Sequence, residues 1–91
     1  MITKVVHCKK ETYDVYIGRP SIFGNPFSIG KDGNREEVIE KYKIYFYDRL
    51  IKDNNFGRRV WECKGKTLGC WCKPLACHGD VIADYLNKND N

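Results

Sequence analysis

The chain has 91 residues, of which 42% are hydrophobic, 13% aromatic and 31% charged, and its formal net charge is +4. This length supplies one hydrophobic core and excludes a second domain of ordinary size. The charge excess falls short of the dense basic patch that makes nucleic acid the default partner, and it suits an anionic small molecule equally well.

No apolar stretch approaches the roughly 18 residues that cross a bilayer, and residues 1–7 lack the apolar run of a signal peptide. We therefore expect a cytoplasmic protein with no membrane partner. It should form a single compact domain over residues 1–91, with a polar tail that frays from about residue 88.

The first third of the chain predicts two short strands and a long ordered loop. Residues 2–7 are a β-branched run, and residues 13–17 place Tyr13, Val15 and Ile17 on one face at a period of two. The sixteen residues that follow exclude helix and regular strand because they contain Gly18, Pro20, Gly24, Pro26, Gly30 and Gly33.

The rest of the chain predicts three helices and one strand. Asn34 and Glu37 form a capping box, and apolar residues recur at helical spacing from there to residue 50. Residues 56–63 predict a short second helix, residues 66–72 a strand, and Gly79 opens a last helix. An acidic residue in the first turn of that helix is favourable against the helix dipole.

This order predicts an α/β fold with a small mixed or parallel sheet of about three strands, flanked by helices in a single, three-layer-like domain. Strands 13–17 and 66–72, joined by the helices, form a candidate βαβ unit. If they pair in parallel, the loops after Ile17 and Cys72 leave the same edge of the sheet, where open α/β sheets bind ligands. The loop of Arg19 and the loop of His78 should then lie together.

The five cysteines are expected to be reduced thiols, because the cytoplasm is reducing and their odd number argues against a closed disulfide framework. Zinc is one interpretation of the segment 70–80, with Cys70, Cys72, Cys77 and His78 as ligands. In the other interpretation Cys70 and Cys72 are small buried hydrophobic residues of a core strand. We expect no cofactor, with zinc as the alternative.

The same segment holds the candidate catalytic residues. Cys77 precedes a helix and adjoins His78, an arrangement that lowers a thiol pKa and favours a nucleophile, although it also fits a thiol without chemistry. The amides of Gly79 and Asp80 could hold a phosphate. Asp80 fits a general base or a helix cap, and His78 fits an acid–base group or a packing residue.

The loop after residue 17 supplies candidate ligand-binding residues. Arg19 follows the strand end with a fork of donors suited to phosphate, or it pairs with a nearby carboxylate. Asn25 lies in a tight turn, where its amide could contact a ligand or stabilise its own turn. The candidate binding residues are therefore Gly18, Arg19, Pro20, Gly24, Asn25 and Gly79.

Two motifs carry a resemblance to a known family. The segments Gly18-Arg19-Pro20 and Gly24-Asn25-Pro26, followed by Cys70-Trp71-Cys72 and Cys77-His78-Gly79-Asp80, resemble the bacterial and phage domain-of-unknown-function family 4326. The resemblance runs from about residue 15 to residue 86 and implies a stand-alone compact domain, often phage-encoded. It implies no particular activity, and it places the family's motif residues in these segments.

Together these features favour a pocket for a nucleotide-like or ADP-ribose-like anion, which the protein either sequesters or hydrolyses or transfers. Whether it is an enzyme stays open. The first alternative is a small module that is stabilised by a bound zinc ion and binds nucleic acid or a protein. The second is an inhibitor that contacts a host enzyme through its surface alone.

Overall fold

The computed structural model describes residues 2–88. Strands and helices follow in the predicted order, although the strands are shorter than expected. The elements are β1 (Lys4–His7), β2 (Val15–Tyr16), α1 (Arg35–Lys52), α2 (Asn54–Trp61), β3 (Thr67–Cys70) and α3 (Gly79–Lys88). The tail expected to fray beyond residue 88 lies outside the described residues. Between residues 2 and 88, no helix combines the length and apolar character needed to cross a membrane.

The three strands form one parallel sheet in the order β1-β3-β2. Leu68 of β3 is the register partner of Val5 on one side and of Val15 on the other. The parallel pairing of β2 with β3, joined through α1 and α2, confirms the predicted βαβ pairing. The carboxyl ends of all three strands consequently meet at one edge of the sheet.

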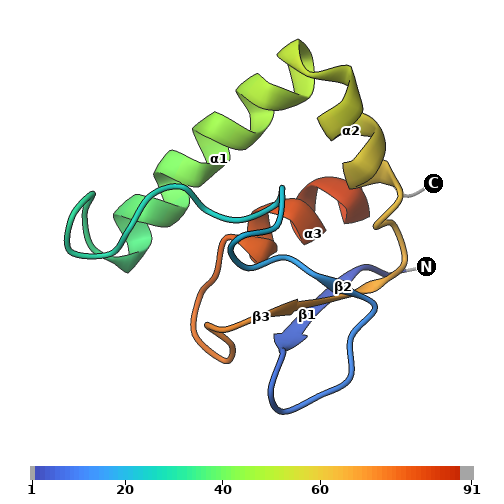
Figure 1. Ribbon diagram of the computed structural model, residues 1–91, viewed down its shortest axis with the longest axis horizontal. Coiled ribbons are helices and arrows are strands. Elements are labelled where there is room, and N and C mark those ends of the chain that lie inside the picture. Colours follow the sequence, from blue (N-terminus) through green and yellow to red (C-terminus); the bar gives the residue numbers. More distant parts are fainter. Residues whose placement is uncertain (1, 89–91) are drawn as a thin grey trace.

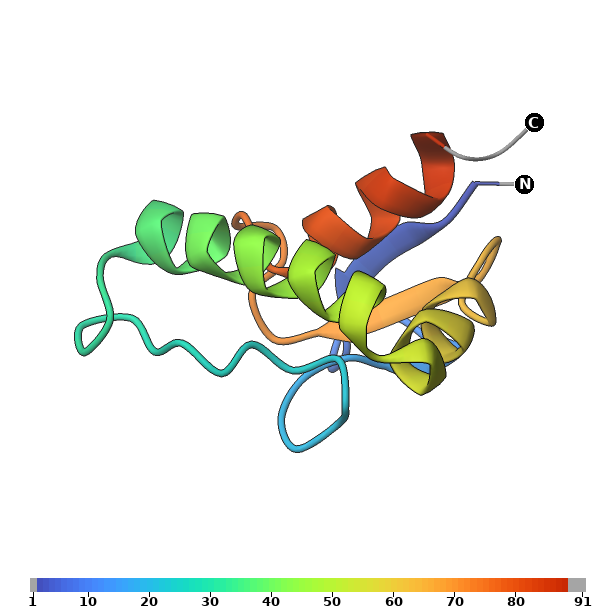
Figure 2. The same cartoon turned by 90° about the horizontal axis from the view of Figure 1, so that it is seen from above.

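All three helices lie on one face of the sheet (Figures 1 and 2). Leu68 and Cys70 are fully buried beneath them, in a core that includes Ile17 just after β2 and Tyr42 and Phe46 from α1. The domain therefore has two layers, one sheet and one layer of helices, where the sequence led us to expect a three-layer-like arrangement.

The opposite face of the sheet is crossed by the connection from β1 to β2, because these two strands flank β3 and do not pair with each other (Figure 1). Tyr13, near the end of this connection, lies directly against Gly69 of β3. A Cβ atom at Gly69 would lie 2.6 Å from Cγ of Tyr13. A residue without a side chain is thus required where the connection passes under the central strand.

Helix α1 begins as the sequence predicts. The side chain of Asn34 accepts a hydrogen bond from the Glu37 amide, and the Glu37 side chain accepts one from the Asn34 amide, each at 2.9 Å. Further along α1, the buried hydroxyl of Tyr42 donates to the carbonyl of Phe23 at 2.9 Å. This bond fastens the long loop to the helix, so the loop folds back on the core.

Candidate functional site

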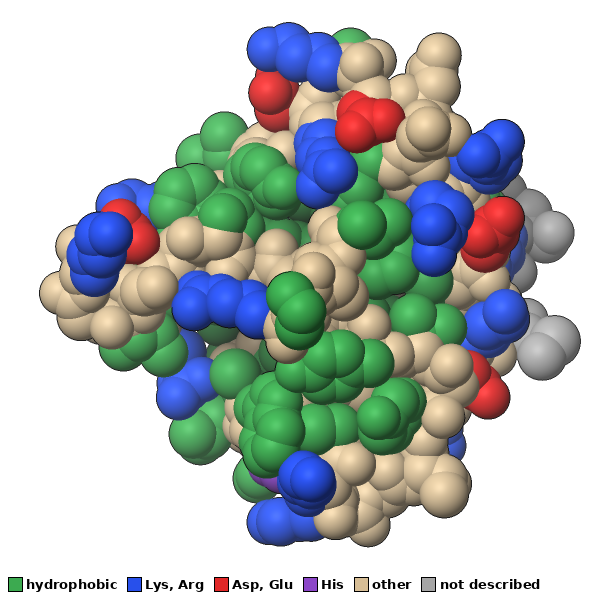
Figure 3. All heavy atoms as spheres, viewed as in Figure 1, with side chains coloured by type: hydrophobic (Ala, Val, Ile, Leu, Met, Phe, Trp, Pro, Cys, Tyr) green, Lys and Arg blue, Asp and Glu red, His purple; other side chains and the backbone are tan. Residues whose placement is uncertain are grey.

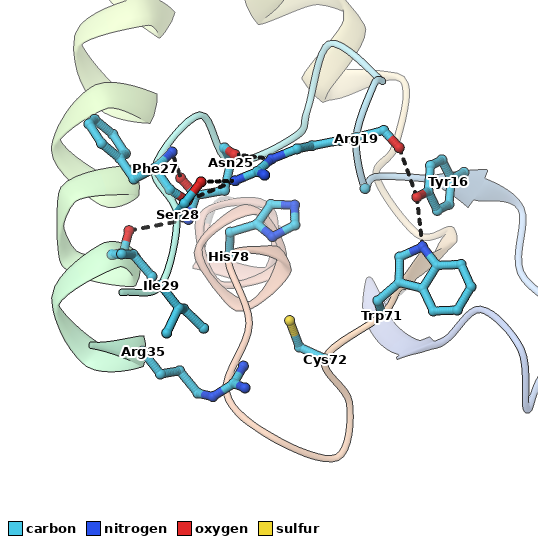
Figure 4. A pocket seen from close by; sticks show the side chains of 12 residues that line it. Tyr16, Arg19, Asn25, Phe27, Ser28, Ile29, Arg35, Trp71, Cys72 and His78 are labelled. Atoms are coloured by element: carbon cyan, nitrogen blue, oxygen red, sulfur yellow. Dashed lines mark hydrogen bonds between the residues drawn. The ribbon is translucent and has the colours of Figure 1, made fainter. Parts of the chain in front are cut away.

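A pocket of about 520 Å³ opens at the carboxyl edge of the sheet (Figure 4). It lies between the end of β2, the loop that follows, the first turn of α1 and the segment between β3 and α3. Its described lining residues are Tyr16, Gly18, Arg19, Asn25, Phe27, Ser28, Ile29, Arg35, Val38, Trp71, Cys72 and His78.

The two segments that the sequence places at this edge do meet there. Nε2 of His78 lies 2.8 Å from the carbonyl oxygen of Ile17, the residue that follows β2. Arg19 and His78 both line the pocket. The prediction that the Arg19 loop and the His78 loop lie together is confirmed, and it rested on the parallel pairing of β2 and β3.

Arg19 braces the loop that forms one wall of the pocket. Its Nε donates to the carbonyl of Asn25 at 2.8 Å, and its Nη2 donates to the carbonyl of Phe27 at 2.9 Å and to Oγ of Ser28 at 3.2 Å. No carboxylate among the described residues pairs with it, contrary to one of the interpretations above. The guanidinium is held rigidly at the pocket by bonds to neutral oxygen atoms, and its positive charge is not neutralised there.

Asn25 stabilises its own loop. Its Oδ1 accepts from the Phe27 amide at 2.9 Å, and its Nδ2 donates to the carbonyl of Val38 in α1 at 3.2 Å. Both ends of the side-chain amide thus have partners within the protein. Asn25 lines the pocket and fixes its wall, as in the turn-stabilising interpretation.

His78 is a buried wall residue. Its Nε2 faces the Ile17 carbonyl, which requires the proton on that nitrogen, and its Nδ1 lies 3.7 Å from Sγ of Cys77. Burial lowers the pKa of His78, and the hydrogen bond to Ile17 opposes this only in part. The imidazole is therefore neutral near pH 7, and its two nitrogen atoms face protein groups. An acid–base role for it stays a prediction.

Cys70 and Cys77 form a buried pair at the end of β3 and just before α3. The Cys77 thiol donates to Sγ of Cys70 across 2.8 Å. This hydrogen bond, together with burial, raises the pKa of Cys77. The sequence suggested a lowered pKa for this thiol, but the neighbouring sulfur and the loss of solvent outweigh the helix start. Cys77 also lies outside the set of residues that line the pocket.

Asp80 and Gly79 organise the start of α3. The Asp80 carboxylate accepts from the Cys77 amide at 3.0 Å and pairs with Nζ of Lys73 at 2.5 Å. The Gly79 amide donates to Sγ of Cys77, and the Asp80 amide donates to the Cys77 carbonyl. The amides proposed to cradle an anion thus have partners inside the protein, and Asp80 is not among the residues that line the pocket.

The glycines and the proline of the first motif are placed differently from one another. Gly18 lines the pocket, where a Cβ atom would lie 2.4 Å from the hydroxyl oxygen of Tyr16. Pro20 and Gly24 are not among its described lining residues. Gly24 packs against Arg19 and Ser21, so its contribution is to the shape of the loop that Arg19 braces.

Arg35 and Trp71 are pocket residues outside the set of candidate site residues predicted from the sequence. Arg35 is the first residue of α1, is half-buried, and donates from Nη1 to the carbonyl of Ala76 at 3.2 Å. Trp71 is 54% exposed, and its Nε1 donates to the hydroxyl of Tyr16 at 2.8 Å. The hydroxyl of Tyr16 in turn donates to the Arg19 carbonyl at 2.9 Å, so Trp71 is tied to the Arg19 loop. The sequence carried one signal for Trp71, which alternates with the buried Cys70 and had to face away from the core.

The predicted zinc ligands are not assembled around a common point. Within residues 2–88, no three His, Cys, Asp or Glu side chains are grouped so that they could hold a metal ion. Cys70 and Cys77 contact each other, whereas Cys72 lines the pocket.

The family described as "Domain of unknown function (DUF4326)" matches residues 3–88. The chain belongs to this family. The matched residues include both motifs, and therefore the two segments that bring Arg19 and His78 to the pocket.

Two relatives are viral. The chain is 39% identical over 88 residues to the "Uncharacterized 12.4 kDa protein in nrdA-td intergenic region" of Enterobacteria phage T4, which covers 96% of this chain and 80% of the relative. It is 36% identical over 87 residues to "Uncharacterized protein R718" of Acanthamoeba polyphaga mimivirus, which covers 76% of this chain and 63% of that protein. No solved structure matches this chain.

Proposed function

We propose that this domain binds a nucleotide-like anionic small molecule in the pocket at the carboxyl edge of its sheet. The observation that carries the proposal is the composition of the lining. Two arginines and the aromatic rings of Tyr16, Phe27 and Trp71 surround the same space, and none of the described lining residues is Asp or Glu. A volume of about 520 Å³ is suitable for a ligand of this size.

Arg35 is the principal candidate to hold the anion. It extends from the first turn of α1 towards the pocket (Figure 4), and among the described residues only its Nη1 has a hydrogen-bond partner. The other guanidinium nitrogen atoms can donate to a phosphate in the bidentate geometry that arginine favours. Arg19 adds a second positive charge that is already fixed in place, so binding would order few additional groups.

Trp71 is the candidate to hold the base. Its indole is anchored by the hydrogen bond to Tyr16 and by an edge-to-face contact with His7 at a centroid distance of 5.8 Å. An exposed ring that is already held in place offers a stacking surface at little cost in side-chain entropy. A planar base against Trp71, with its phosphate near Arg35, is consistent with the arrangement of the lining.

The same lining favours binding without turnover. The carboxylate predicted to act as a base, Asp80, is engaged with Lys73 and the Cys77 amide away from the lining. His78 faces protein groups through both ring nitrogen atoms. A ligand in this pocket would therefore contact cations and aromatic rings, but no free carboxylate among the described lining residues. Such a lining favours holding the ligand over hydrolysing it.

The test is calorimetric titration of the protein with nucleoside mono- and diphosphates and with ADP-ribose. Arg35→Ala should weaken binding by about 1.5–3 kcal/mol, the value of a hydrogen bond to a charged group. Arg58→Ala is the matched control, because Arg58 is exposed on α2 and bonds to Asn55. Arg19→Ala is less informative, since it also releases the loop that Arg19 braces.

The stacking contribution is tested with a second matched pair. Trp71→Ala should weaken the binding of nucleotides more than that of inorganic phosphate, whereas Trp61→Ala, a similarly exposed tryptophan on α2, should change neither. The proposal fails if no nucleotide binds, or if Arg35→Ala and Arg58→Ala have equal effects on the affinity.

A further inference from the structure

The aromatic surface of the pocket continues outside it. Trp71 and Tyr16 line the pocket, and Tyr13 lies beyond them with its ring centroid 6.4 Å from that of Tyr16. Trp71 is 54% exposed and Tyr13 is 42% exposed. We call these three residues the aromatic strip. A mononucleotide that fills the pocket would leave the far end of this strip uncovered.

Positive charge accompanies the strip at its pocket end. Nζ of Lys9 lies 5.5 Å from the centroid of the Trp71 ring, and Arg19 and Arg35 lie at the pocket. Figure 3 shows a hydrophobic area on the lower part of this face, with Lys and Arg side chains along its border. The carboxylate nearest the strip in sequence, that of Asp14, accepts a hydrogen bond from the Thr67 amide at 2.8 Å.

We propose that the ligand is a single-stranded nucleic acid, with one nucleotide in the pocket and neighbouring bases stacked on the aromatic strip. This inference rests on the proposed function of the pocket and names the class of molecule that supplies the nucleotide. Exposed rings interleaved with cations bind single strands because each base offers a face for stacking and each linkage carries a phosphate. A duplex does not fit this chemistry, because its bases are already stacked on one another.

The strip also has the polar character that this ligand requires. Its rings carry the phenol groups of Tyr13 and Tyr16 and the indole N–H of Trp71. Lys9 is exposed and can reach a phosphate while its side chain covers the indole. Stacking and phosphate contact can thus occur next to each other outside the pocket.

The experiment compares labelled ten-nucleotide strands of deoxyuridine and of uridine with the corresponding mononucleotides and with a duplex, by fluorescence anisotropy and competition. The two strands carry the same base and differ in the 2′-hydroxyl, so a preference for one of them identifies the sugar. Each single strand should bind about 5- to 150-fold more tightly than its mononucleotide, the range expected for one additional stacked base. The duplex should bind more weakly than the single strands.

Two substitutions outside the pocket separate this inference from the proposed function. Tyr13→Leu keeps an apolar side chain against Gly69 but removes the aromatic face, so it should weaken strand binding about 5- to 150-fold and leave mononucleotide affinity unchanged. Lys9→Ala should reduce the slope of log affinity against log salt by about 0.7, the value for one phosphate contact in a single strand. The control is Lys64→Ala, because Lys64 and Trp61 form a similar cation–ring pair elsewhere on the molecule.

The outcomes are distinguishable. If mononucleotides bind but the strands bind no more tightly, or if both substitutions leave strand binding unchanged, the inference is overturned and the proposed function stands. A duplex that binds as tightly as the strands also overturns it, because phosphate contacts alone would then explain the affinity. If neither strands nor mononucleotides bind, the proposed function fails as well.

Discussion

Substituting Gly79 tests whether the start of α3 is shaped by packing against the sheet or by a bound ligand. A Cβ atom added there would lie 2.5 Å from Cδ1 of Ile17 and 3.0 Å from a methyl carbon of Val5. Ile17 is fully buried in the core, where interiors are close-packed, so its methyl group can give way only by displacing its neighbours. Gly79→Ala should therefore push the first turn of α3 away from the sheet.

We expect this substitution to lower the free energy of unfolding by about 1–3 kcal/mol, the usual cost of overpacking a well-packed core. For a domain of this size, each kcal/mol corresponds to a fall in Tm of about 4–8 °C. Urea denaturation followed by tryptophan fluorescence measures the change directly, provided that the m-value is unaltered. Gly57→Ala is the control, because a Cβ atom in α2 would meet only the Leu50 carbonyl oxygen at 3.8 Å. It should raise the stability by about 0.5–1 kcal/mol.

A stable Gly79→Ala variant would refute this packing argument. If such a variant also failed to bind any nucleotide, Gly79 would instead be a residue that allows a ligand to approach the backbone, as one interpretation of the sequence suggested. If the variant were as stable as the wild type and still bound nucleotides, Gly79 would have neither role.

Three further changes probe the interior. Tyr42→Phe removes the buried bond to the Phe23 carbonyl and should cost about 1–3 kcal/mol in thermal or chemical unfolding. Cys70→Ala should cost roughly 1–2 kcal/mol, whereas the half-buried Cys72 should tolerate alanine within about 0.5 kcal/mol; equal losses would contradict the observed burial. Because burial lowers the pKa of His78, the unfolded chain takes up a proton before the folded one does. The free energy of unfolding should therefore fall as the pH drops below about 6.5, and this slope should be absent from His78→Gln measured above about pH 5.

The elements that the sequence predicted well are those with local causes. The capping box at Asn34 fixes the start of α1 through contacts within one turn, and the apolar positions of α1 repeat at helical spacing. The strands are shorter than predicted because the length of a strand depends on the residues with which it pairs, and these lie elsewhere in the chain. Only Val15 and Tyr16 of the predicted strand 13–17 are paired in the ladder with β3.

The candidate site was predicted in part, through topology. Arg19 and His78 meet because parallel strands deliver their following loops to one edge, which could be inferred without coordinates. Arg35 could not be found in this way, because its approach to Ala76 depends on how α1 packs over the sheet. The pKa of Cys77 is raised, opposite to the direction expected from the sequence, because only the tertiary structure places Sγ of Cys70 2.8 Å away. Its role as a nucleophile stays a prediction.

The central position of β3 has a consequence for how the chain folds. Both β1 and β2 pair with residues 67–70, so neither strand has a partner until about three quarters of the chain has been synthesised. Closing contacts over such separations is slow compared with forming the local turns of α1. The sheet should therefore appear in one late, cooperative step, and the pocket edge would exist only in a chain that has completed it.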